Sequence, residues 1–250
     1  MKFREEYKLI FPMNPDIIII QECEDLRNIH FDLFSNTPSD LYWIGTNPSK
    51  GLGVITFNDY KISLYEGYDD SFKYILPLLI TKKSISYNLI GVWTQLVGKG
   101  TKDHINYIRQ FKLSMKTYDS FIKTNNTIII GDFNSNLIWE KPKKHIDYDH
   151  KYVVEELQKK NIESSYHYFF KEKQGEETKP TFYYHHKQEK TFHIDFCFLS
   201  KNLTKKINSV EIGKYHDWIK YSDHVPMIIN LDHFDLLPFV NVKRTKHKKS

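Results

Sequence analysis

The stretch Thr-Ile-Ile-Ile-Gly-Asp-Phe-Asn, residues 127–134, sets the pattern on which this chain is built. Its first four residues are β-branched or apolar throughout, as in a strand that is buried on both faces. Gly131 permits a tight exit from that strand, and Asp132 and Asn134 follow at once. Ligands of α/β sheets gather at the carboxyl ends of strands. The stretch therefore predicts an α/β fold with a functional site at this strand end.

Three further strings show the same pattern. Each joins an apolar run to an acid, an amide or an imidazole: Ile-Ile-Ile-Ile-Gln-Glu (17–22), His-Ile-Asp-Phe-Cys-Phe-Leu-Ser (193–200) and Ser-Asp-His-Val-Pro (222–226). Strand ends are where a β-sheet enzyme carries its chemical groups. The strings therefore add Glu22, Asp195, Asp223 and His224 to the candidate site residues.

The rest of the chain predicts many strands and few helices. Helical spacing of apolar residues predicts helices over 2–13, 103–123 and 149–160, the first ended by Asn14-Pro15-Asp16. Other strands are expected over 41–45, 52–57, 61–65, 74–80, 85–93 and 226–231. Residues 181–200 are expected to form a β-hairpin with arms 181–186 and 191–199. Together these elements predict two sheets packed face to face, with helices outside.

Composition indicates a single domain without repeats or linkers, over residues 1–240. The net charge of +5, from 36 basic and 31 acidic residues, permits a polyanionic partner without requiring one. The last eight residues hold five Lys or Arg, so 241–250 is expected to be a disordered basic tail or, alternatively, a tether for nucleic acid. Two cysteines within apolar runs indicate free thiols in a reducing compartment. No apolar stretch predicts a membrane span or a signal peptide, so a cytoplasmic location is expected.

The acids at the first two strand ends suit the hydrolysis of a phosphate ester. Glu22 is a candidate oxygen ligand for Mg²⁺, or alternatively an ordinary solvated acid at a strand end. Asp132 is placed to orient and deprotonate a water, and Asn134 to hydrogen-bond that water or the developing phosphorane. The alternative for both is an Asx-turn, in which Asp and Asn are common.

The third and fourth strings supply a carboxylate and an imidazole. Asp195 beside His224 would favour the charged ring and fix its orientation, so that His224 neutralises the scissile phosphate. Asp223 is a candidate for the metal shell, and His193, on the same strand face as Asp195, a candidate phosphate contact. The alternative for His224 is a core histidine, since the chain has 12 His.

These motifs, in this order over residues 17–226, resemble the endonuclease/exonuclease/phosphatase superfamily, the deoxyribonuclease-I-like metal-dependent phosphoesterases. The resemblance implies a four-layer sandwich of two packed mixed β-sheets flanked by helices. It also implies that Glu22 binds Mg²⁺ (Mn²⁺ is the alternative) and that Asp132 handles the nucleophile. Asn134 and His224 would hold the phosphate, and Asp195 would pair with His224. The Pro-Thr-Phe sequence at 180–182 and Trp218, shortly before Ser222, resemble sequences found in bacterial members of the superfamily. This adds Trp218 as a substrate-binding candidate.

The sequence departs from the family pattern in two places. The family has an Asn at the end of a strand before the first helix, and this chain has no counterpart. We expect the native protein to be longer than 250 residues, the alternative being a lost strand and metal ligand. After the strand 85–93 the family often has a Tyr or His that touches the phosphate. Here Gln95 and, from the next helix, Tyr107 are the candidates.

Three functions follow from these residues. The first is a metal-dependent phosphodiesterase acting on nucleic acid, in particular an endonuclease, which the basic balance and the many aromatic residues favour. The second is the same chemistry on a small-molecule or lipid phosphate, because the motifs report the phosphate and not what it carries. The third is an inactive member of the superfamily with a binding role. The missing Asn is the observation that supports it.

Overall fold

A computed structural model of the chain describes residues 3–31, 36–96, 107–140 and 150–232. Six strands form its largest sheet, in the order β4 (Lys61–Leu64), β5 (Ile75–Lys82), β6 (Ile85–Trp93), β7 (Thr127–Asp132), β11 (Asp195–Ser200) and β8 (Ile162–Ser164). The β6–β7 pair is parallel and the other pairs are antiparallel, so the sheet is mixed.

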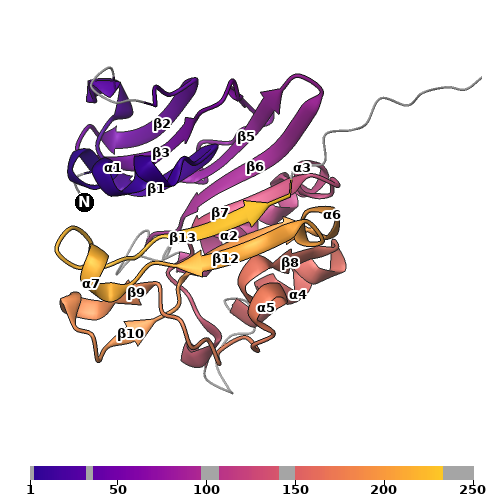
Figure 1. Cartoon of the computed structure of the whole chain (residues 1–250). Helices are drawn as coiled ribbons and strands as arrows, with labels where there is room; N and C mark the ends of the chain where they lie inside the picture. The colour runs from indigo at the N-terminus through magenta and orange to yellow at the C-terminus, as the bar shows by residue number, and fades with distance from the viewer. Residues whose placement is uncertain (1–2, 32–35, 97–106, 141–149, 233–250) are drawn as a thin grey trace, which may run out of the picture.

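A second layer of strands packs against the inner face of this sheet (Figure 1). It consists of a three-stranded sheet, β1 (Ile17–Cys23), β3 (Lys50–Thr56) and β2 (Asp40–Asn47), and a two-stranded sheet, β12 (Ile207–Ile212) and β13 (Met227–Leu231). Because side chains alternate along a strand, Ile17 and Ile19 of β1 face the six-stranded sheet, whereas Ile18 and Ile20 face outward.

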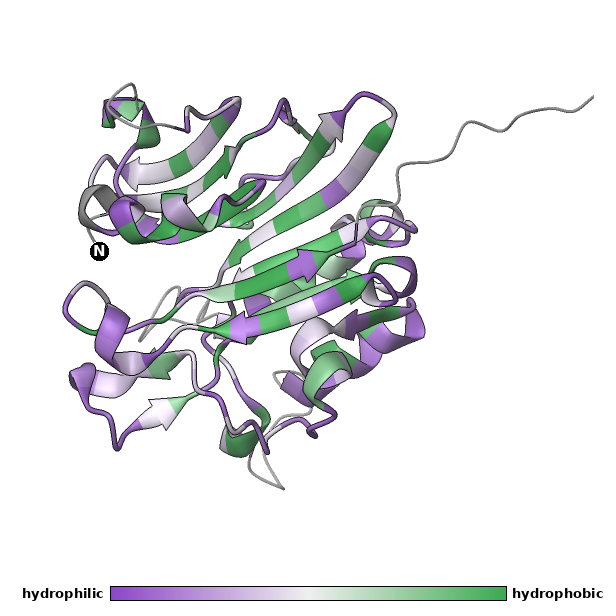
Figure 2. Ribbon diagram, in the orientation of Figure 1, coloured by the Kyte–Doolittle hydropathy of each residue, from purple (hydrophilic) through white to green (hydrophobic). Residues whose placement is uncertain are grey.

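Helices cover the outer faces of both layers. The six-stranded sheet packs on α2 (Tyr107–Thr117), α3 (Asp119–Ile122) and α4 (His150–Lys159), and the β1–β3 face packs on α1 (Phe3–Ile10), η1 (Phe11–Met13) and η2 (Leu26–Asn28). Hydrophobic residues line the strands between these layers (Figure 2). The predicted fold class, a four-layer α/β sandwich, is confirmed.

The remaining elements are short. They are η4 (Leu137–Trp139), α5 (Ser165–Phe170), β9 (Phe182–Tyr183), η6 (Tyr184–His186), β10 (Thr191–Phe192), α6 (Lys201–Thr204) and α7 (Tyr215–Trp218). None of the helices in the described ranges is both long and apolar enough to cross a membrane.

The prediction of one continuous helix over 103–123 is wrong. Residues 103–106 lie outside the described part, and the rest divides into α2 and α3 at Tyr118. The backbone of Tyr118 leaves helical geometry (φ −95°, ψ 20°). Its buried hydroxyl accepts a hydrogen bond from the Asp69 backbone N–H at 3.0 Å. This tertiary contact is invisible to apolar periodicity, which runs through both helices.

The hairpin over 181–200 is also shorter than predicted. Only Phe182–Tyr183 and Thr191–Phe192 pair with each other. Residues 184–186 turn into η6, and after residue 194 the chain enters the six-stranded sheet as β11. The predicted second arm, 191–199, is therefore divided between two sheets: its first residues pair with β9, and its later residues belong to the six-stranded sheet.

Candidate active site

Two carboxylates meet where β7 ends and β11 begins. Asp132 is the last residue of β7 and lies directly opposite Asp195, the first residue of β11. Both share the strand face of Ile130 and Cys197, which points toward the second layer of strands. Antiparallel neighbours lie about 5 Å apart, so residues 63 positions apart are held side by side.

Gly131 is the residue that the exit from β7 requires. Its φ is +146°, and a Cβ there would come within 1.9 Å of the Val92 carbonyl oxygen of β6 and 2.8 Å of Gln21 Nε2 of β1. Any other residue would push β7 away from β6, and Asp132 with it.

Asn134 fastens the Asp132 carboxylate. Its backbone N–H donates to Oδ1 at 2.7 Å, and its side-chain Nδ2 donates to Oδ2 at 2.6 Å and to the Thr94 carbonyl oxygen at 3.1 Å. Asn134 has a φ of +45°, which Asn tolerates better than most residues. The Asx-turn considered as the alternative is therefore present, and it gives Asp132 one fixed orientation.

His224 pairs with Asp195, as the sequence predicted. The ring Nδ1 lies 2.9 Å from Asp195 Oδ2. The His224 backbone N–H donates to Ser222 Oγ at 3.0 Å, and the ring packs on Phe182 with centroids 4.7 Å apart. Because Nδ1 is held by the carboxylate, Nε2 is the ring nitrogen that this ion pair leaves available.

The acids around His224 outnumber the cations. Burial alone would lower the pKa of His224, but Asp195, then Asp132 and Asp223, raise it to about 10, so the ring is an imidazolium at neutral pH. Burial and the charge of Asp195 raise the pKa of Asp132, and Glu22 adds to the rise. The cluster thus gathers Asp132, Asp195 and Asp223 around one imidazolium, and the charged form of Asp132 is disfavoured there.

Glu22 lies at the end of β1, in an irregular position between Gln21 and Cys23 with a φ of +59°. Its carboxylate is 41% exposed and contacts Lys50 Nζ at 3.0 Å. Within the described residues, no three His, Cys, Asp or Glu side chains form a metal-binding group. Mg²⁺ commonly uses only one or two carboxylates plus waters, and the carboxylates of Glu22 and Asp132, which act on each other electrostatically, are oxygen donors of the kind that fits such a cation.

The other sequence candidates take different places. Asp223 is half-buried, and its charge acts on His224. The Gln95 backbone N–H donates to Gln110 Oε1 at 3.3 Å, directly after Thr94 that holds Asn134. Tyr107 is half-buried at the start of α2. Trp218 is only 5% exposed and packs in a cluster with Tyr183 and Val225, as a core residue.

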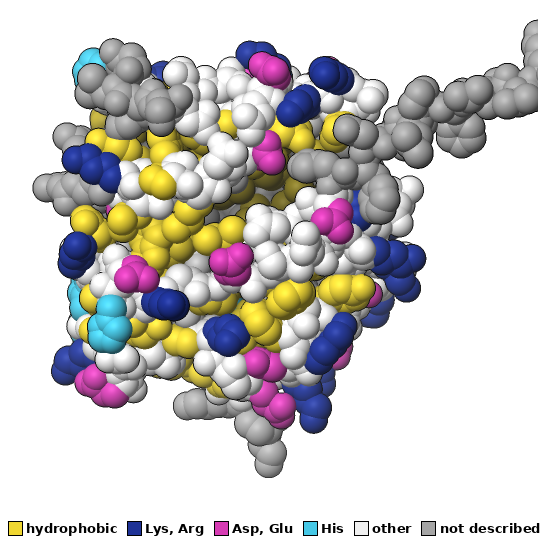
Figure 3. Space-filling view, in the orientation of Figure 1, with side chains coloured by type: hydrophobic (Ala, Val, Ile, Leu, Met, Phe, Trp, Pro, Cys, Tyr) yellow, Lys and Arg dark blue, Asp and Glu magenta, His cyan; other side chains and the backbone are white. Residues whose placement is uncertain are grey.

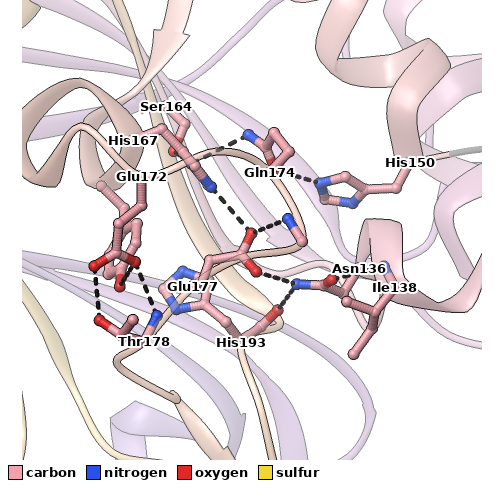
Figure 4. Close-up of polar contacts among 12 residues, drawn as sticks. Asn136, Ile138, His150, Ser164, His167, Glu172, Gln174, Glu177, Thr178 and His193 are labelled. Atoms are coloured by element: carbon pink, nitrogen blue, oxygen red, sulfur yellow. Dashed lines mark hydrogen bonds and ion pairs between the residues drawn. The ribbon is translucent and has the colours of Figure 1, made fainter.

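His193 belongs to a separate polar network, shown in Figure 4. Its ring Nδ1 bonds the Lys179 carbonyl oxygen at 2.8 Å, and the ring is buried. In the same network Glu177 accepts hydrogen bonds from Gly175 N, Asn136 Nδ2 and His167 Nε2 at 2.9–3.2 Å. Sequence reasoning missed Glu177 and His167, because neither lies at the end of an apolar run.

A row of aromatic rings leads away from His224 over the surface. Phe182, which packs on His224, is followed by Phe192 at 6.4 Å and then by Trp139 at 5.0 Å. Trp139 is 45% exposed. Tyr184 branches from Phe182 at 6.2 Å and is equally exposed.

No protein-family model and no curated protein matches the sequence. The fold matches solved structures at low identity. The 3'-5' exonuclease NExo from Neisseria meningitidis has a TM-score of 0.62 at 14% identity, over 91% of this chain and 96% of that chain. An AP endonuclease from Archaeoglobus fulgidus gives 0.62 at 15%, over 90% and 92%. The endonuclease domain of TRAS1, a telomere-specific non-LTR retrotransposon, gives 0.61 at 13%, over 92% and 91%.

The chain has the deoxyribonuclease-I-like fold. This likeness, at the level of fold, confirms the resemblance to the endonuclease/exonuclease/phosphatase superfamily that the four strings predicted.

Proposed function

We propose that this protein hydrolyses phosphodiester bonds in nucleic acid, as a metal-dependent endonuclease. The observation that carries the proposal is the Asp195–His224 pair beside the Asn134-held carboxylate of Asp132. Two proteins of this fold, an AP endonuclease and the 3'-5' exonuclease NExo, support it.

Each residue has a part in this chemistry. The His224 imidazolium hydrogen-bonds a non-bridging phosphate oxygen through Nε2 and balances the charge that builds up during attack. Asp195 keeps the ring charged and oriented. Asp132 aims the attacking water and, in its ionised form, accepts the water's proton; the pKa of about 8 makes that carboxylate a stronger base than an ordinary Asp. Asn134 holds Asp132 in place.

The acidic end of β1 is the part that we assign to a divalent ion. Glu22 and Asp223 are the residues that would hold Mg²⁺, or Mn²⁺ in its place, once Lys50 releases Glu22. A bound divalent ion supplies a Lewis acid for a phosphoryl oxygen.

The aromatic row favours nucleic acid over a small phosphate ester. Exposed rings leading from a phosphate site offer stacking faces for successive bases, worth about 1–3 kcal/mol per base. We therefore expect Trp139→Ala to raise the KM for a single-stranded oligonucleotide roughly 10-fold and to leave bis(p-nitrophenyl) phosphate hydrolysis unchanged. Phe169→Ala, an exposed aromatic in another cluster, is the matched control. Equal effects on both substrates would count against base stacking.

Nicking of supercoiled plasmid by the full chain, with Mg²⁺ and with EDTA, tests the proposed activity. The proposal expects nicking that EDTA abolishes and that Asp132→Asn removes, with circular dichroism confirming that the variant is folded. Nicking that survives Asp132→Asn would contradict the assigned site. Hydrolysis of the small ester by a folded protein that leaves DNA intact would favour a small-molecule or lipid phosphate substrate instead.

A further inference from the structure

Three loops meet at the end of the six-stranded sheet that lies opposite Asp132. Residues 123–125 precede β7, residues 159–161 join α4 to β8, and residues 200–202 join β11 to α6. Together they line a pocket of ≈ 240 Å³. The strand β7 runs from this end of the sheet to the active site, and from Thr127 to Asp132 it spans about 17 Å. The pocket is therefore separate from the active site.

Hydrogen bonds between the loops fix the shape of the pocket. The Lys201 backbone N–H donates to the Asn161 carbonyl oxygen at 2.9 Å, which joins the second loop to the third. Ser200 Oγ donates to the Asn125 carbonyl oxygen at 2.6 Å and accepts from the Thr127 backbone N–H at 3.2 Å, which joins the third loop to the first. The walls of the pocket are thus held in place without a ligand, which lowers the cost of binding one.

The lining of the pocket is basic and polar throughout. Lysine supplies four of its nine residues, asparagine three, and serine and threonine one each, so the lining has no acid and no aromatic ring. Every one of these side chains carries a hydrogen-bond donor. No described residue hydrogen-bonds the side-chain amides of Asn125, Asn161 and Asn202. Such a lining suits a small anion that accepts several hydrogen bonds.

Nearby carboxylates neutralise only part of the positive charge. Asp119 binds both Lys123 and Lys160, at 2.7 Å and 2.5 Å, so one acid serves two cations. Lys159 binds a glutamate of its own helix at 2.6 Å. Lys201 is exposed, and no described residue forms an ion pair with it. Figure 3 shows Lys and Arg side chains gathered at the right-hand edge of the molecule, where Figure 1 places α4 and α6.

Helix ends account for some of these lysines but not for Lys201. Lys123 follows α3 and Lys159 ends α4, and a cation is favourable at the carboxyl end of a helix. Lys201 is instead the first residue of α6, where an acid would be favoured. Its backbone, and not its side chain, makes the contact between the loops. The described fold therefore gives no reason for the charge of Lys201, whereas a bound anion would.

We propose that this pocket binds a backbone phosphate of nucleic acid, as a second contact remote from the active site. The pocket is smaller than the about 300 Å³ at which sites for drug-sized ligands begin, so it fits one phosphate group better than a whole nucleotide. It offers no ring on which a base could stack and no Arg to read a base edge. Lysine binds phosphate as a point charge, and such a contact carries no sequence information. The choice of nucleic acid as the source of the phosphate rests on the proposed function.

Binding of a fluorescein-labelled DNA duplex by the full-length chain, in EDTA, tests the proposal without cleavage. We expect Lys201→Gln to weaken binding about 5-fold at 0.1 M salt, and to lower the slope of log Kd against log salt concentration by about one, whatever the DNA sequence. Lys8→Gln, which removes an exposed charge from α1 on the other side of the molecule, should change neither. Native affinity and native slope in Lys201→Gln would overturn the proposal.

Amide NMR spectra of the full-length chain locate the contact and identify the source of the phosphate. Titration with the duplex should shift the amides of all three loops, 123–125, 159–161 and 200–202. Shifts confined to the active-site residues would overturn the proposal. An equal response to inorganic phosphate at the same phosphate concentration would also overturn it, because the free anion would then be the ligand. An equal response to polyglutamate would do so in favour of an acidic protein.

The endonuclease proposal and the pocket proposal can fail separately. Plasmid nicking together with native duplex binding by Lys201→Gln would leave the proposed function standing and remove the pocket. Shifts in the three loops and weakened binding by Lys201→Gln, without any nicking by the native chain, would leave the pocket as a nucleic-acid site and remove the proposed endonuclease activity.

Discussion

The Asp195–His224 pair and the Glu177–His167 pair are made of the same two groups at nearly the same separation, 2.9 Å and 3.0 Å. Their surroundings differ. Glu177 is only 3% exposed, and three donors satisfy it. Asp195 and His224 are 16% and 24% exposed, and further acids lie beside them. A carboxylate–imidazole pair is therefore not a site by itself.

The two regions also differ in how they shift the pKa of their carboxyl groups. Burial alone would raise the pKa of Glu177, but the hydrogen bonds of His167 and the Gly175 backbone lower it to about 2. The ionised carboxylate of Glu177 is thus stabilised by hydrogen bonds from within the protein, without a bound cation. Beside the Asp195–His224 pair, burial and then the charge of Asp195 raise the pKa of Asp132, and Glu22 adds to the rise. Such a region gains from a cation, and such groups often mark functional sites.

Removal of His224 should have the largest effect on activity. We expect His224→Ala to lower kcat for oligonucleotide cleavage about 1000-fold, the size found when one transition-state hydrogen-bond donor is lost. His216→Ala, at an exposed histidine in α7, should retain full activity. A thermal melt of each variant separates lost chemistry from lost fold. Activity within a few-fold of the native chain would place the catalytic group elsewhere.

Removal of Glu177 should instead cost stability. Glu177→Ala leaves buried donors of His167 and Asn136 without their acceptor, so the free energy of unfolding should fall by about 3 kcal/mol, measured by urea denaturation. Its exposed neighbour offers the control Glu176→Ala, which should change stability by less than about 0.5 kcal/mol. Cleavage per folded molecule should stay near the native rate. A selective loss of kcat would make Glu177 part of the active site.

Acid should weaken the second region through His150, whose ring Nε2 lies 3.2 Å from Gln174 Oε1, while Gln174 in turn bonds His167 (Figure 4). Burial lowers the pKa of His150 to about 4, below its ordinary value of 6.5. Between these values the unfolded chain binds a proton that the folded chain does not, so stability falls as pH decreases from 6.5. From pH 6.5 to 5 the loss should be about 2 kcal/mol. His150→Phe, which keeps the ring contact with Phe196, should remove this part of the slope. An unchanged slope would contradict the assignment.

The exposed Lys50–Glu22 pair should matter least to stability. Its side chains are 51% and 41% exposed, so Lys50→Gln should shift the unfolding free energy by less than about 0.5 kcal/mol. The same change frees Glu22, and the Mg²⁺ concentration for half-maximal activity should decrease. Glu22→Gln should increase it. If neither variant alters the Mg²⁺ dependence, Glu22 is not a ligand.

The sequence predicted the parts of the molecule that follow from local pattern. Apolar runs that end in acids placed Asp132 and Asp195 at strand ends, and alternation along β7 and β11 brings both to one face. The features that the sequence did not predict depend on tertiary contacts between residues far apart in the chain. The hydroxyl of Tyr118 reaches Asp69 where the predicted helix breaks. Glu177 gathers its donors from distant loops, where no periodicity marks a partner.

The titration of the histidine ring protons of the full chain by NMR, without divalent metal, tests the contrast between the two regions most directly. Spectra of His224→Ala and His150→Phe assign the two signals. We predict that His224 titrates near pH 10 and His150 near pH 4, on opposite sides of the ordinary value of 6.5. Two rings that both titrate near 6.5 would contradict it, because neither the acidic surroundings of His224 nor the burial of His150 would then act as described.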